Sequence, residues 1–193
     1  MVATPSTMLE LGTKVPDFSL RNAVDDHTVT PADFDDRDGL LVMFICNHCP
    51  YVKHVLSEIT AIASEYQPKG VGVVAINAND IEAYPQDGPE HMKQLAGSEG
   101  WTFPFLLDED QEVAKKFRAA CTPDFYLFDG DHRLVYRGQL DDSRPDSGIP
   151  LTGNDLRAAL DALLAGKPPL EEQKPSLGCN IKWKKGNEPE YFG

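Results

Sequence analysis

The chain has 193 residues, of which 18 are Lys or Arg and 31 are Asp or Glu, so its formal net charge is −13. Hydrophobic residues make up 41% and charged residues 25%, which is typical of globular proteins and excludes collagen-like, coiled-coil and wholly disordered chains. The acidic balance repels phosphate backbones and anionic lipid surfaces, so we expect neither nucleic acid nor a membrane as a partner.

The first half of the chain predicts a strand, a helix and a second strand. Residues 15–38 are expected to form an N-terminal hairpin, because weak apolar alternation leads into an Asp-rich segment. The continuous apolar run 40–45 predicts a strand buried on both faces. From Pro50 to Tyr66 apolar residues recur at helical spacing, and a second apolar run follows over 71–76. This order predicts a parallel pair of strands joined by a helix.

The middle of the chain predicts further alternation of helix and strand. Helices are expected over 88–99 and 112–118, with a short apolar segment at 103–107 between them. Strands over 124–128 and 134–137 flank an Asp-Gly turn, which predicts an antiparallel hairpin. The overall prediction is an α/β fold.

The C-terminal part predicts one more helix and then a tail. The helix should cover 156–164, with Asn154 as its N-cap and Gly166 just past its end. Residues 167–193 contain four Pro and no sustained period, so we expect a tail that packs on or near the domain formed by residues 1–166 or stays mobile.

The sequence Cys46-Asn47-His48-Cys49 lies where the central strand ends and the helix begins. The N-terminus of a helix favours thiolate over thiol, so we predict that Cys46 is a nucleophile. Cys49, two residues further on, is close enough to form a small disulfide with it. Asn47 and His48 are expected to tune the pair, since positive charge on His48 would stabilise the thiolate and make the disulfide a stronger oxidant.

Metal binding is a weaker interpretation of the same pair. Zinc needs four ligands, and the other two cysteines are isolated in the sequence rather than paired. A metal-binding or redox-sensing module using Cys46 and Cys49, with His48 or His54, stays open as an alternative. Residues 70–72 lack the third Gly of a nucleotide fingerprint, so no organic cofactor is expected.

The chain resembles thioredoxin-fold proteins of the peroxiredoxin-like branch of the AhpC/TSA group. The resemblance covers about residues 12–166 and rests on Pro-Asp-Phe-Ser-Leu at 16–20, on the strand ending in Cys-Asn-His-Cys at 46–49, and on Thr122-Pro123 before a strand. It implies a three-layer fold with a central mixed sheet. It also implies that the Thr122-Pro123 bond is cis and that this loop positions an extended substrate beside Cys46.

Two departures from the family patterns bear on function. Peroxiredoxins carry a Thr three residues before the peroxidatic Cys and a Pro four residues before that Thr; counted back from Cys49, this chain has Cys46 and Val42. The hydroxyl that would orient a peroxide is therefore missing, which weakens the peroxidase interpretation. Thioredoxins carry a buried acid six residues before the first Cys, where this chain has Leu40, so proton transfer must use another group or water.

The other two cysteines are possible accessory thiols. Cys121 directly precedes Thr122-Pro123, so its sulfur either lies near the active pair or is a small buried apolar group. Cys179 lies on the tail, and either folds back as a second resolving cysteine or is structural.

The predicted function is thiol-disulfide exchange, in which Cys46 attacks a substrate disulfide and Cys49 resolves the mixed disulfide. The substrate would be a disulfide-bearing protein or a low-molecular-weight thiol, and an external thiol donor must reset the pair. Peroxide reduction through a sulfenic acid is the first alternative. The start of the sequence lacks the features of an export signal, and four cysteines are too few for a disulfide scaffold, so we expect a cytoplasmic protein.

Overall fold

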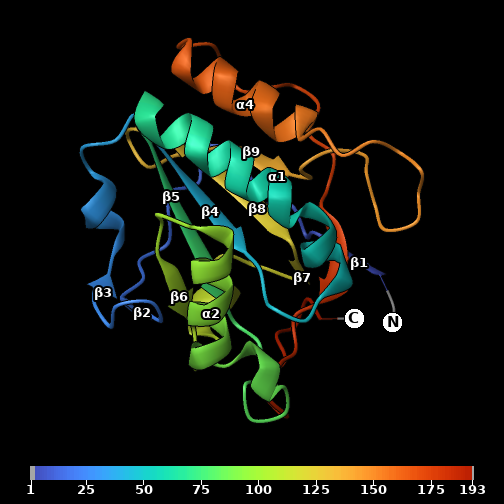
Figure 1. Ribbon diagram of the computed structural model, residues 1–193. Helices are drawn as coiled ribbons and strands as arrows, with labels where there is room; N and C mark the ends of the chain where they lie inside the picture. The colour runs from blue at the N-terminus through green and yellow to red at the C-terminus, as the bar shows by residue number, and fades with distance from the viewer. Residues whose placement is uncertain (1–2, 193) are drawn as a thin grey trace.

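The computed structural model describes residues 3–192, which form a sheet covered by helices on both faces and a second, smaller sheet (Figure 1). The strands of the large sheet are β2 (Leu20–Asn22), β3 (Thr28–Val29), β4 (Gly39–Phe44), β5 (Val71–Asn77), β6 (Phe105–Leu107), β8 (Asp124–Asp129) and β9 (Leu134–Gly138). The helices are α1 (Pro50–Tyr66), α2 (Pro89–Glu99), α3 (Glu112–Lys116) and α4 (Asn154–Leu164), with short 3-10 turns at Pro31–Phe34, Gln67–Lys69 and Pro85–Asp87.

The large sheet is mixed, with the strand order β3-β2-β6-β5-β4-β8-β9. Strands β4, β5 and β6 are parallel neighbours, whereas β8 and β9 are antiparallel. The sequence predictions of a parallel β4–β5 pair joined by a helix and of an antiparallel hairpin after it are therefore confirmed. The N-terminal hairpin is formed by β2 and β3 and joins the sheet through β6.

Central strand β4 is buried on both faces because its alternate side chains enter two different cores. Leu41 and Met43 belong to the core under α1, α2 and α4. Val42 and Phe44 belong to the opposite core, which contains residues of α3 and of both terminal segments. This two-sided packing gives three layers, and it places the C-terminal end of β4 at the edge where α1 begins (Figure 1).

The second sheet was not predicted. It has the order β1-β10-β7 and consists of β1 (Ala3–Pro5), β10 (Leu177–Asn180) and β7 (Cys121–Thr122), all antiparallel. The segment expected as an irregular tail thus contributes the central strand of a sheet. The strand is four residues long and pairs with residues more than 50 positions away, so no local period announces it.

Two smaller expectations need correction. Gly153, with φ of 65°, is the N-cap of α4, and Asn154 is its first helical residue. Helix α3 ends at Lys116 rather than at residue 118, since Arg118 adopts a positive φ of 51°. No helix within residues 3–192 is long and apolar enough to cross a membrane.

Candidate active site

The Cys-Asn-His-Cys sequence forms a loop between the end of β4 and the start of α1. Strand β4 ends at Phe44, and α1 begins at Pro50 with Cys49 as its N-cap. Proline suits the first helical position, because its missing N–H would have no partner there and its φ is already helical. Cys49 is consequently at the positive end of the helix dipole, whereas Cys46 lies three residues before it.

Three sulfur atoms from two distant parts of the chain meet at this end of α1. The Sγ atoms of Cys49 and Cys179 lie 2.8 Å apart, and Cys46 shares a hydrogen bond with Cys49 that affects the pKa of both. We call Cys46, Cys49 and Cys179 the thiol cluster. Their exposed fractions are 1%, 0% and 2%, so all three are closed off from solvent in this structure.

The cis-proline loop lies directly against the thiol cluster. The Thr122-Pro123 bond is cis, as the family resemblance implied. The Thr122 hydroxyl lies 3.5 Å from the sulfur of Cys46, and the Thr122 carbonyl oxygen lies 3.2 Å from the sulfur of Cys49. The loop therefore borders both cysteines of the motif.

The two cysteines of the motif have opposite acidities, in the reverse order of the sequence prediction. The pKa of Cys49 is lowered, because the thiols of Cys179 and Cys46 donate to its sulfur and the backbone N–H of Val52 in the first turn adds to their effect. The pKa of Cys46 is raised, because it shares its proton with Cys49, is buried, and feels the carboxylate of Asp87. These surroundings favour ionisation at Cys49, whereas the sequence predicts the thiolate at Cys46.

Asp87 is a site residue that sequence reasoning missed. It is fully buried in the 3-10 turn Pro85–Asp87, and its Oδ1 accepts the backbone N–H groups of Asn47 at 2.8 Å and His48 at 3.1 Å. Its Oδ2 pairs with His48 Nδ1 at 2.5 Å and accepts the amide of Asn79 at 2.9 Å. The carboxylate thus fixes the loop between the two cysteines from a segment 40 residues away.

His48, which the sequence predicts to tune the pair, has two close neighbours in the structure. The ring lies against Asp87 and stacks on Tyr84, with centroids 5.3 Å apart. The carboxylate of Asp87, next to the ring, raises the pKa of Cys46 through its negative charge. Asn47 contributes its backbone N–H to the same carboxylate.

A partial set of metal-ligating atoms is present at the same place. Ligand atoms of Cys46, His48 and Asp87 lie within 4.8 Å of one another. Both carboxylate oxygens of Asp87 already accept hydrogen bonds, so the residue acts on the loop rather than offering an open ligand position. His54, the other predicted ligand, pairs instead with Ser143 Oγ at 2.7 Å.

Cys121 is not part of the thiol cluster. Its sulfur lies 3.7 Å from the carbonyl oxygen of Pro123, and its neighbour on β7, Thr122, projects to the other face of the strand. Burial and the nearby carboxylate of Asp124 raise its pKa. The alternative of a small buried apolar group describes it better than an accessory thiol.

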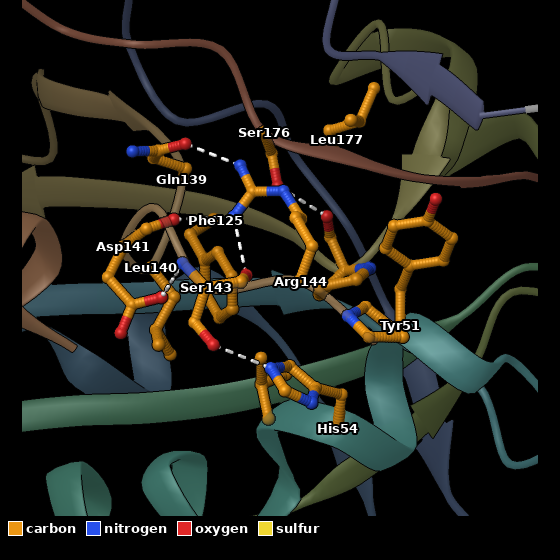
Figure 2. A pocket seen from close by; sticks show the side chains of 13 residues that line it. Tyr51, His54, Phe125, Gln139, Leu140, Asp141, Ser143, Arg144, Ser176 and Leu177 are labelled. Atoms are coloured by element: carbon orange, nitrogen blue, oxygen red, sulfur yellow. Dashed lines mark hydrogen bonds between the residues drawn. The ribbon is translucent and has the colours of Figure 1, made fainter. Parts of the chain in front are cut away.

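A small pocket adjoins the cis-proline loop. Tyr51 and His54 of α1 line one side, and Figure 2 shows Arg144 lying across it with a hydrogen bond to Gln139. Pro123 and the segment that leads into β10 complete the lining. Its free volume is about 10 Å³, which is close to what one water molecule needs.

Comparisons with known proteins agree with this architecture. Residues 10–156 match the family model described as Redoxin. The crystal structure of an uncharacterized conserved protein from Geobacillus kaustophilus is 58% identical, with a TM-score of 0.93, and the match covers 95% of this chain and 97% of that one. Solved thioredoxin-like structures with less than 25% identity share the fold, so the thioredoxin-like architecture predicted from the resemblance is confirmed.

Two curated relatives carry functional names. The thiol-disulfide oxidoreductase ResA of Oceanobacillus iheyensis is 25% identical over 135 residues, and a Mycobacterium tuberculosis protein provisionally named a peroxiredoxin is 28% identical over 110 residues. The matches cover 67% and 57% of this chain, and 66% and 64% of the relatives, so the chain spans just under two thirds of their length.

Proposed function

The chain belongs to the Redoxin family, and from that premise we propose that it is a thiol-disulfide oxidoreductase whose attacking group is the thiolate of Cys49. The observation that carries this proposal is the position of Cys49 as the N-cap of α1, beside the cis-proline loop, with a lowered pKa. A thiolate at a helix N-terminus is the form that attacks a disulfide sulfur. The name of the ResA relative supports the same reaction class.

The proposed reaction has two steps. Cys49 attacks a substrate disulfide and forms a mixed disulfide, and a second thiol of the thiol cluster then displaces the substrate. The sequence prediction paired Cys46 with Cys49, and the structure supports that pair with the roles exchanged: Cys49 attacks and Cys46 is a candidate to resolve. An external thiol donor restores the reduced state. Such donors are abundant in the cytoplasm, where we propose that the protein acts.

Peroxide reduction is the second candidate function, and the burial of the thiol cluster favours it. Exposed fractions of 2% or less admit a small oxidant more readily than a protein disulfide. In that reaction the Cys49 thiolate would take one oxygen from peroxide to give a sulfenic acid and hydroxide. A neighbouring thiol would then condense with the sulfenic acid and release water.

The test compares the two oxidants directly. Fully reduced protein receives one equivalent of glutathione disulfide or of hydrogen peroxide, and the products are followed by rapid quenching and mass spectrometry. We expect rapid glutathione adduct or disulfide formation that depends on Cys49, with peroxide reacting no faster than with a free thiol. Peroxide reacting orders of magnitude faster than glutathione disulfide would instead establish the peroxidase.

A further inference from the structure

We propose that Cys179 on β10, rather than Cys46, is the cysteine that resolves the mixed disulfide on Cys49. This inference rests on the proposed function and extends it to a residue of the C-terminal segment. Its first support is contact: the two sulfur atoms lie 2.8 Å apart, although 130 positions separate them in the sequence.

The fold holds Cys179 at this place through β7. In the β10–β7 ladder Cys179 is directly opposite Thr122, the residue before the cis proline. Gly178 makes this approach possible, since a Cβ on it would lie 2.0 Å from the Thr122 carbonyl oxygen. Any side chain at this position would push β10 away from the loop.

Contacts on both sides of Gly178 and Cys179 fix the segment further. The Ser176 hydroxyl donates to the Pro123 carbonyl at 2.6 Å, and the Ile181 N–H donates to the Ala120 carbonyl at 3.0 Å. Ile181 and Trp183 are buried in the core that includes α3. The C-terminal segment therefore delivers Cys179 to the site as a defined part of the fold.

The charged groups near the two thiols favour Cys179 over Cys46 as the resolving thiol. Both have a raised pKa because each shares a proton with Cys49. Once Cys49 is bonded to substrate it carries no negative charge, so it no longer raises the pKa of Cys46 or of Cys179. Asp87 continues to raise the pKa of Cys46, whereas Lys182 lowers that of Cys179. The ammonium of Lys182 is held 2.8 Å from the Asn180 carbonyl at the end of β10.

The proposed reaction consists of two thiol-disulfide exchange steps. The Cys49 thiolate attacks one sulfur of the substrate disulfide, the substrate S–S bond breaks, and the leaving thiolate takes up a proton. Cys179 gives up its proton and attacks Cys49 Sγ, forming the Cys49–Cys179 bond and breaking the bond to the substrate, whose second thiolate is protonated. The substrate gains two electrons and two protons; the two cysteines lose two electrons and the one proton of Cys179, the second proton comes from solvent, and an external dithiol reverses the change.

Because Cys49 is buried beside β10, the proposed reaction requires β10 to move away from β7 when the substrate binds. Cys49 is not exposed, and the neighbouring pocket has room for about one water. Separation of β10 from β7 breaks the two residue pairs of this ladder and the hydrogen bonds of Ser176 to Pro123 and of Ile181 to Ala120, while the three β1–β10 pairs stay formed. Return of β10 brings Cys179 back onto the mixed disulfide.

The experiment compares Cys179→Ser with Cys46→Ser as a matched pair, using glutathione disulfide on the reduced full chain. We expect Cys179→Ser to stop as a glutathione adduct on Cys49, whose lifetime is at least about 100-fold longer than in the wild type. Cys46→Ser alters one of the donors to Cys49 and can slow the first attack, but the adduct that forms should still be resolved to the Cys49–Cys179 disulfide, with a far shorter lifetime than in Cys179→Ser. Long-lived adduct in Cys46→Ser, with a Cys46–Cys49 disulfide in Cys179→Ser, would overturn the inference while leaving the proposed function intact.

A second pair of variants tests the role of β10 without removing a thiol. Gly178→Val should displace β10 and slow formation of the Cys49–Cys179 disulfide by at least about tenfold, whereas Gly97→Ala, where a Cβ meets nothing within 4 Å, should not. Equal rates for the two would contradict the inference. If glutathione disulfide forms no adduct with the wild type or any variant, the proposed function itself fails, and oxidation by diamide still reports which cysteine pairs with Cys49.

Discussion

Cys49 and Cys121 are two fully buried cysteines that contact the same cis-proline loop, and their pKa values shift in opposite directions. Cys49 lies 3.2 Å from the carbonyl of Thr122, and Cys121 lies 3.7 Å from the carbonyl of Pro123. Neither side chain is exposed. The pKa of Cys49 is nevertheless lowered, while burial raises the pKa of Cys121.

The difference comes from what each sulfur contacts. Cys49 is the N-cap of a 17-residue helix and receives hydrogen bonds from two other thiols, so its negative charge is compensated without water. Cys121 lies on a two-residue strand, and the nearby carboxylate of Asp124 opposes its ionisation. The contrast indicates that the arrangement of donors around a sulfur sets the direction of its pKa shift, whereas burial without donors raises the pKa.

Removing each sulfur in turn is the strongest test of this comparison. Cys49→Ser should reduce the reaction with glutathione disulfide by at least about 100-fold, because no other described thiol has a lowered pKa. It should also abolish the ultraviolet absorbance of the thiolate at neutral pH. Cys121→Ser is the control and should retain both properties. Loss of the reaction with glutathione disulfide in Cys121→Ser would mean that Cys121 is also required for activity, which contradicts the comparison.

A second test perturbs the Cys121 side alone through its buried ion pair. Arg137 donates to Asp124 at 3.0 Å, and neither side chain is exposed. Arg137→Met leaves a buried carboxylate without its partner and should lower the free energy of unfolding by about 3–5 kcal/mol, as measured by urea denaturation.

The thiolate absorbance of Cys49 in the folded Arg137→Met variant should be unchanged. Asp124→Asn combined with Arg137→Met is the control and should recover part of the lost stability, since no charge is then left uncompensated. A loss below about 1 kcal/mol in the single variant would show that the pair does not stabilise this side of the loop.

The elements that flank the Cys-Asn-His-Cys motif were predictable because local sequence determines them. The apolar run 40–45 and the period from Pro50 to Tyr66 match β4 and α1 to within one residue. The helix position on which the proposed Cys49 thiolate depends was also within reach. Pro50 indicates the first helical position, which makes Cys49 the N-cap and leaves Cys46 outside the helix.

The partners of the nucleophile were not predictable, because they come from distant segments. Asp87 lies in a Pro-Gln-Asp-Gly turn with no feature to distinguish it from other surface aspartates. Its role depends on the fold bringing it under the loop at 46–49. Strand β10 is too short for a periodic signal, and only its pairing with Thr122 makes Cys179 a neighbour of Cys49.

The pH dependence of the attack by Cys49 on a disulfide should show an effect of intermediate size. The pKa of Cys49 is lowered, so the thiolate is already present at pH 6 and the rate of attack should change by less than about threefold up to pH 8. An unperturbed thiol with a pKa near 8.5 would speed up by about 80-fold over the same interval. The unfolded protein in urea provides that reference, and a steep profile in the folded protein would overturn the assignment of Cys49.

The smallest expected effect is that of shortening Cys121. Cys121→Ala removes one buried sulfur from a site without solvent exposure, which should cost about 1 kcal/mol of unfolding free energy through lost packing. Urea denaturation measures this change, and the rate with glutathione disulfide should stay within about twofold of wild type. The small size is informative, because packing is then all that Cys121 contributes. A rate change well beyond that range, at nearly unchanged stability, would indicate that Cys121 communicates with Cys49 through the cis-proline loop.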